Sequence, residues 1–78
     1  MELNTFIQNF EKQLEDVAPG SVGADTVFKD LDEWDSMTAL SMIAMVDEEY
    51  SVKLTGNEIK QAQTVEDLFN IVKGKNSY

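Results

Sequence analysis

The sequence predicts an all-α fold: a small four-helix bundle with a long loop between helices 1 and 2 and a short third helix. Apolar residues recur at three- and four-residue steps in several segments, which is the period of an amphipathic helix. Strand-like alternation is confined to YSVKL at 50–54, which is short and has no second strand to pair with. With 78 residues and no internal repeat, we expect residues 1–78 to form a single domain.

The first helix is predicted from one apolar face near the start of the chain. Its residues are Leu3, Phe6, Ile7, Phe10, Leu14 and Val17. Thr5 and Gln8 have the spacing of a capping box, although Leu3 favours an earlier start. APG at 18–20 should end the helix, because Pro19 has no backbone donor.

A long connection, residues 18–35, follows and contains two glycines and five acids. Loops of this length are uncommon in compact domains and are often functional. We expect Val27, Phe28 and Leu31 to hold it against the core. The sequence leaves open whether Trp34 packs over the loop or stands exposed.

Asp35 is the predicted N-cap of the second helix, because its carboxylate can accept a bond from an unpaired backbone N–H one turn further on. The apolar residues that follow end near Tyr50 and cover more than one face of the helix. They are Met37, Leu40, Met42, Ile43, Met45 and Val46. Such a helix is either buried or presents an apolar patch to a partner.

The last third of the chain predicts a short helix and a longer one. TGNEIKQAQ at 55–63 supports only a helical turn around Asn57–Gln61. Thr64 and Asp67 predict a capping-box-like start for the last helix, with Asp in place of the usual Glu. Gly74 and the polar KNSY after it should end that helix.

The chain is strongly acidic, with 15 acids against six bases and a net charge of −9. This charge repels nucleic acid and anionic membranes, and it attracts proteins that carry basic patches. The chain has no cysteine, no signal-like start and no apolar run long enough for a membrane span. We therefore expect a cytoplasmic monomer with no stable membrane insertion.

Ser36 follows Asp35 at the expected helix start, in a chain without histidine. A nucleophilic serine needs a base within hydrogen-bond reach and a group that orients the base. No histidine supplies that base, and no G-x-S-x-G elbow surrounds the serine, so hydrolase chemistry is disfavoured. The position also has an ordinary structural explanation, since Ser and Asp favour helix starts.

The acids of the loop do not form a recognisable calcium motif. Asp30 and Asp32 match the first and third positions of an EF-hand loop. Trp34, Asp35 and Ser41 then occupy the fifth, sixth and twelfth positions, where a ligand, Gly and Glu belong. We predict no metal site, and at most weak cation binding by the acidic loop.

A helix N-terminus favours an attached phosphate, because unpaired N–H groups and the positive end of the helix dipole face it. Asp35 opposes this by like-charge repulsion, so Ser36 suits a singly charged phosphodiester better than a doubly charged monoester. If another enzyme modifies Ser36, that enzyme supplies the base, and the serine needs only exposure.

These features together resemble the acyl carrier proteins. Their motif, Asp-Ser-Leu at the start of the second helix, stands here as DSM at 35–37. The resemblance covers essentially the full length, through VFKDL at 27–31, VDEEYSVKL at 46–54 and TVEDLFNIV at 64–72.

The resemblance implies a protein with no catalysis of its own. It implies that Ser36 carries 4′-phosphopantetheine, transferred from coenzyme A by a pantetheinyl transferase, and that the thiol of this arm holds an acyl group as a thioester. Asp35 would help the transferase to hold its magnesium ion. The second helix would meet acyl-transferring or condensing enzymes that carry basic patches. The positions implied for these contacts are Met37, Leu40, Asp47 and Glu48.

The resemblance also implies that the core shelters the acyl chain. The residues expected to line this pocket are Phe28, Met42, Ile43, Val46, Leu54, Ile59, Ala62 and Leu68. Met42 and Met45 have a simpler interpretation as core filling.

Several positions depart from the pattern of fatty-acid carriers. Met37 replaces the usual Leu, and Glu33 and Trp34 precede the aspartate where a Gly is usual. Thr38 and Ser41 are neutral where acids are frequent. A specialised, polyketide-like pathway is therefore an alternative to fatty-acid biosynthesis. The residues also leave open an aminoacyl carrier charged by an adenylating enzyme, an unmodified acidic helical adaptor, and a carboxylate-based hydrolase.

Overall fold

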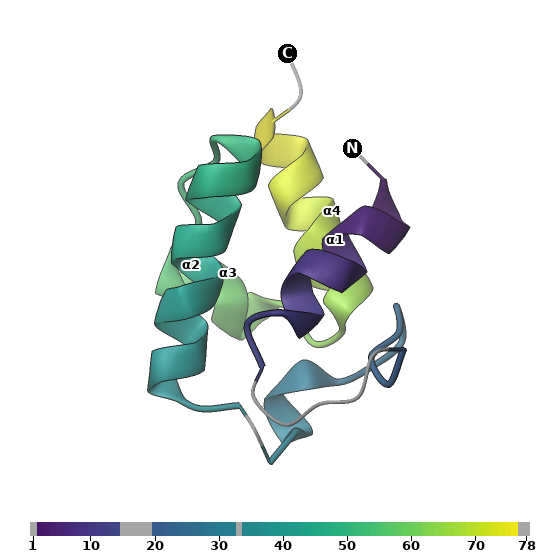
Figure 1. Cartoon of the computed structure of the whole chain (residues 1–78). Helices are drawn as coiled ribbons and strands as arrows, with labels where there is room; N and C mark the ends of the chain where they lie inside the picture. Colours follow the sequence, from purple (N-terminus) through teal and green to yellow (C-terminus); the bar gives the residue numbers. More distant parts are fainter. Residues whose placement is uncertain (1, 15–19, 33, 77–78) are drawn as a thin grey trace.

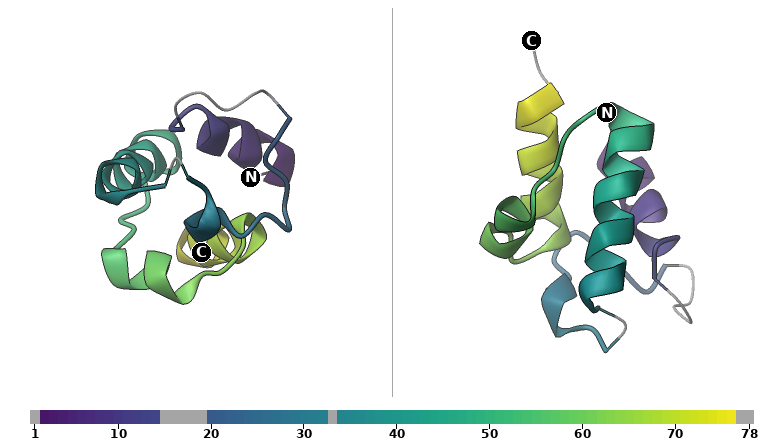
Figure 2. Two further views of the ribbon diagram at one scale, coloured as in Figure 1. Left: turned by 90° about the horizontal axis from the view of Figure 1, so that it is seen from below. Right: turned by 90° about the vertical axis from the view of Figure 1, so that its left-hand side faces the viewer.

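The computed structural model describes residues 2–14, 20–32 and 34–76. This part of the chain contains no strand, and the all-α prediction is confirmed. Its elements, in chain order, are α1 (Leu3–Glu11), the 3₁₀ turn η1 (Phe28–Asp30), α2 (Ser36–Tyr50), α3 (Gly56–Gln61) and α4 (Val65–Asn76). The loop that carries η1 gathers at the end of the bundle where α2 begins (Figures 1 and 2). Among the described helices, none is long and apolar enough to cross a membrane.

Helix α1 begins at Leu3, the earlier of the two predicted starts. Its N-cap, Glu2, makes no side-chain capping bond, and the capping box suggested by Thr5 and Gln8 is not formed. Phe6 and Phe10 are completely buried, so the predicted apolar face of the helix does pack on the core.

The predicted end of this helix at 18–20 is wrong, because α1 ends at Glu11. The next residues form tighter three-residue bonds, from Gln13 N–H to the Phe10 carbonyl and from Leu14 N–H to the Glu11 carbonyl. The Glu11 carboxylate accepts bonds from the N–H groups of Gly20 (2.9 Å) and Val22 (3.1 Å).

These bonds tie the returning loop to the end of α1. Leu14 remains buried beyond the helix, and Val22 is buried as well. Val17 of the predicted apolar face and Pro19 of the predicted helix end lie outside the described residues.

The loop is anchored by residues three positions apart. Phe28 is completely buried, and Leu31 and Trp34 pack partly buried against the core. Side chains at i and i+3 eclipse each other in a 3₁₀ turn, so these residues share one side of the backbone. Val27 faces the other way and is 43% exposed, so its predicted anchoring role is wrong. Trp34 packs over the loop, which settles the question that the sequence left open.

A chain of aromatic contacts links α1 to the loop and to α2. Phe6 lies 5.9 Å from Tyr50 and 5.5 Å from Phe69 between ring centroids. Phe10 meets Phe28 edge to face at 5.6 Å and stacks on Trp34 at 6.1 Å, with ring planes 5° apart. Aromatic pairs at these spacings contribute about 0.5–1.5 kcal/mol each beyond their buried area. The rings therefore hold the loop up to Trp34, the end of α2 and α4 to α1.

Helix α2 ends at Tyr50 as predicted, with Ser51 in the left-handed conformation (φ 55°) as its C-cap. Val52 and Leu54 of the following YSVKL segment are buried between exposed neighbours, but the segment is an extended connection and not a strand. The last helix, α4, runs through Gly74 and ends at Asn76, within the KNSY segment that the sequence predicted as its end.

Candidate functional site

Ser36 is the first residue of α2 and is exposed. Asp35 is extended (φ −148°, ψ −175°) and caps the helix, as the sequence predicted. Its Oδ1 accepts bonds from the Thr38 backbone N–H at 2.8 Å and from the Thr38 hydroxyl at 3.0 Å. The cap fixes the direction in which the chain enters the helix, and it thereby fixes where the Ser36 hydroxyl stands.

The same bonds keep Asp35 ionised. The backbone N–H of Thr38, followed by its hydroxyl, stabilises the carboxylate and lowers the pKa of Asp35 below its ordinary value. The positive end of the α2 dipole attracts an anion, while the Asp35 carboxylate repels one. A group attached to Ser36 therefore fits best when it carries little negative charge.

Ser36 opens onto a groove with a volume of about 370 Å³. The groove is lined by Lys29, Trp34, Asp35, Ser36, Ala39, Gly56, Ile59 and Lys60. These residues come from the loop, the start of α2 and α3, so the groove exists only in the folded chain. A larger hollow of about 710 Å³ between α1 and the loop shares none of these lining residues.

Helix α2 presents an exposed mixed surface next to this groove. Met37 is 75% exposed and Leu40 is 65% exposed. Asp47 and Glu48 are also exposed, and their spacing of seven to eleven residues from the apolar pair places all four on one side of the helix. Asp47 forms an ion pair with Lys53 at 3.2 Å. The predicted partner-contact residues thus form one surface, and the helix shows its second apolar face to solvent.

The sequence model of one protein family, described as "Phosphopantetheine attachment site", matches residues 5–72. The chain belongs to this family. Members are carriers without catalysis of their own, and their covalent cofactor is 4′-phosphopantetheine. The described site suits such a group, since it combines an exposed hydroxyl at a helix start with a neighbouring groove.

The carrier protein also has a solved structural neighbour. The solution NMR structure of a holo acyl carrier protein from Geobacter metallireducens matches it with a TM-score of 0.75 and 25% sequence identity. The match covers 94% of this chain and 83% of that one. A comparison with curated proteins found no match.

The predicted acyl-pocket residues of the carrier lie together in one continuous core. Seven of them are buried: Phe28, Met42, Val46, Leu54, Ile59, Ala62 and Leu68. Ile43 is only partly buried and packs against them. Ile59 lines the groove beside Ser36 and is only 5% exposed, so the groove meets the core at this residue.

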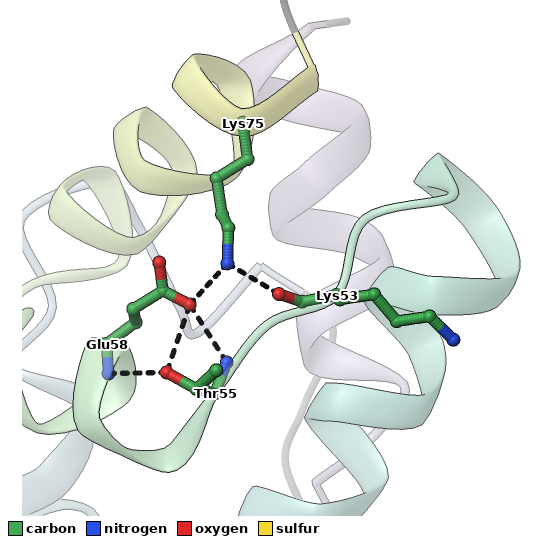
Figure 3. Close-up of polar contacts among 4 residues, drawn as sticks. All are labelled: Lys53, Thr55, Glu58 and Lys75. Carbon is green, nitrogen blue, oxygen red and sulfur yellow. Dashed lines mark hydrogen bonds and ion pairs between the residues drawn. The ribbon is translucent and has the colours of Figure 1, made fainter.

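Sequence reasoning missed the bonds that hold α3 in place. Thr55 and Glu58 form a complete capping box at its start. The T-x-x-E spacing at 55–58 was a visible signal for this box. Figure 3 shows that Lys75 of α4 reaches the same carboxylate and also the backbone carbonyl of Lys53. At the other end of α3, Lys29 Nζ donates to the Lys60 carbonyl at 2.7 Å.

Proposed function

We propose that Ser36 is the attachment residue for 4′-phosphopantetheine and that the chain carries acyl groups as thioesters on this arm. The observation that carries the proposal is the exposed Ser36 hydroxyl at the start of a 15-residue helix, directly after the Asp35 cap. A transferase brings its own base and metal, so it needs only an accessible hydroxyl. The pathway we propose is fatty-acid biosynthesis or a related polyketide-like pathway.

Asp35 and the exposed side of α2 are the proposed recognition elements. Asp35 stands next to the acceptor hydroxyl and is held ionised, which suits a contact with the transferase and its magnesium ion. Met37, Leu40, Asp47 and Glu48 offer apolar and acidic contacts together, which suits partner enzymes with basic patches. A free thiol on the arm needs a reducing compartment, so we place the protein in the cytoplasm.

Intact mass after incubation with a broad-specificity pantetheinyl transferase and coenzyme A tests the attachment. We expect a single pantetheine adduct on the wild type and none on Ser36→Ala. This variant should fold, since Ala is the best helix former. Ser41→Ala, an exposed position on the same helix, is the matched control and should be modified normally.

An adduct that survives in Ser36→Ala contradicts the assignment, and no adduct on the wild type favours the unmodified adaptor. The cargo needs a separate test. Loading of the arm by an adenylating enzyme with an amino acid, but not by acyl-transferring enzymes, would make the chain an aminoacyl carrier.

A further inference from the structure

Two of the six lysines of the chain, Lys29 and Lys60, line the groove that contains Ser36. The chain has 15 acids, yet within the described residues neither ammonium group forms an ion pair. Lys29 Nζ donates instead to the Lys60 carbonyl in the last turn of α3. The groove therefore holds two cationic side chains whose charge no described carboxylate neutralises by direct contact.

This positive charge can offset an electrostatic repulsion at the attachment site. A phosphodiester on Ser36 Oγ would stand next to the ionised Asp35, and the two negative charges repel each other. The phosphodiester is joined directly to the serine oxygen, and Ser36 lines the groove, so the arm starts at this groove. Lys29 and Lys60 line the same groove as Ser36, so their positive charges are placed to offset this repulsion.

The rest of the groove supplies an apolar wall. Ile59 is buried at its base, and Trp34 is held in one orientation by Phe10 and by an edge-to-face contact with Phe28 at 4.8 Å. The pantetheine arm has a matching order of groups, because its phosphodiester is followed by a carbon that bears two methyl groups. Cations and apolar wall thus correspond to the first two parts of the arm.

We propose that Lys29 and Lys60 form a subsite for the phosphodiester, and that Trp34 and Ile59 hold the branched carbon of the arm along the groove. This inference rests on the proposed attachment at Ser36. It gives these four side chains a positioning role: they keep the start of the arm against the protein and leave only its thiol end to move between partners.

Trp34 provides the test, because it is the only tryptophan in the chain. The full chain is converted to the holo form, the adduct is verified by intact mass, and tryptophan emission is compared between apo and holo forms. We expect the emission to change on attachment. In Lys29→Gln/Lys60→Gln, most of this change should be lost and the phosphorus-31 resonance of the arm should move. The control Lys12→Gln/Lys53→Gln removes the same charge elsewhere and should behave like the wild type.

Lys60→Gln alone controls for a folding defect in the double variant, since it leaves the bond from Lys29 to the Lys60 carbonyl intact. It should give part of the effect of the double variant. Equal tryptophan emission in apo and verified holo chains overturns the subsite and leaves attachment at Ser36 standing. An emission change that the groove variant and the control retain equally also overturns it. Absence of any adduct on the wild type overturns both proposals.

Discussion

Lys75 in the last turn of α4 lies 2.6 Å from Glu58 in the first turn of α3, measured from Nζ to Oε1. The same ammonium donates to the Lys53 carbonyl at 2.5 Å, while Glu58 accepts from the Thr55 N–H and hydroxyl. Lys29 contacts the opposite end of α3. A helix of six residues has little stability of its own, so these side chains from other elements hold it over the core.

Loss of this network should destabilise the domain without abolishing the fold. Thr55→Ala removes the cap of α3 and should cost about 1 kcal/mol. In a domain of this size that is a fall in Tm of roughly 4–8 °C. Lys75→Met should add a smaller loss, about 0.2–1 kcal/mol, because its ion pair is partly exposed. Thermal unfolding followed by circular dichroism measures both changes.

Lys53→Met is the matched control, since the Lys53 side chain is 88% exposed and, among the described residues, its ammonium pairs with exposed Asp47. Its backbone carbonyl still accepts the Lys75 bond, so its Tm should stay close to that of the wild type. If Lys53→Met and Lys75→Met unfold at the same temperature, the network contributes nothing specific to α3.

The free energy of unfolding should decrease as pH is lowered, because the capping carboxylates become protonated. Bonds from the backbone N–H groups of Thr64 and Gln63 lower the pKa of Asp67, and the Lys75 hydrogen bond, followed by the Thr55 bonds, lowers that of Glu58. A carboxylate whose pKa is lower in the folded than in the unfolded state stabilises the fold. This contribution is fully present when the pH is above the unfolded-state pKa, which is roughly 4 for these groups. The contribution disappears as pH falls through the folded-state values.

Urea midpoints of the wild type and Asp67→Asn, measured from pH 7 to pH 3, check this expectation. The wild type should be the more stable protein at pH 7, and its advantage should shrink below about pH 4. The comparison removes the changes in overall charge repulsion that both proteins share. An advantage that stays constant down to pH 3 would show that the Asp67 carboxylate charge does not support the cap.

Partner association should depend on the charge of the exposed side of α2. Glu48→Lys is the cleanest change there, because Asp47 is already paired with Lys53. We expect slower association with the transferase at low salt, and a smaller difference at 1 M salt, where the screening length falls to about 3 Å. Glu66→Lys, an exposed change of equal charge on α4, is the control. Equal slowing by the two variants would mean that only net charge matters.

An attached acyl chain should enter the core where the groove meets Ile59. Each buried CH₂ contributes about 0.8 kcal/mol, while opening the packed interior costs existing contacts. The Tm should therefore rise as a saturated chain lengthens, until the pocket is full. Thermal unfolding of holo protein loaded with a series of chains measures this. Equal Tm values for unloaded and loaded forms at every length would place the chain outside.

The sequence by itself determined the features that depend on local interactions. The helical period predicted the helices, and the side chain at Asp35 and the pair Thr64 and Asp67 predicted two helix starts, because a cap joins residues only three positions apart. The same local logic placed Ser36 at an exposed helix start. It also gave the spacing that puts Met37 and Leu40 on one side of α2 with the acids.

Tertiary structure decided whatever depends on residues distant in the chain. Helix α1 ends early where Glu11 takes bonds from the returning loop, and Val27 faces solvent because the turn aims Phe28 inward. The Lys29–Lys60 contact spans 31 positions and the Lys75–Glu58 contact spans 17. Lysine side chains are long and flexible, so periodicity and caps do not specify which carbonyl or carboxylate they reach. Only the packing of η1, α3 and α4 brings these partners together, and with them the groove beside Ser36.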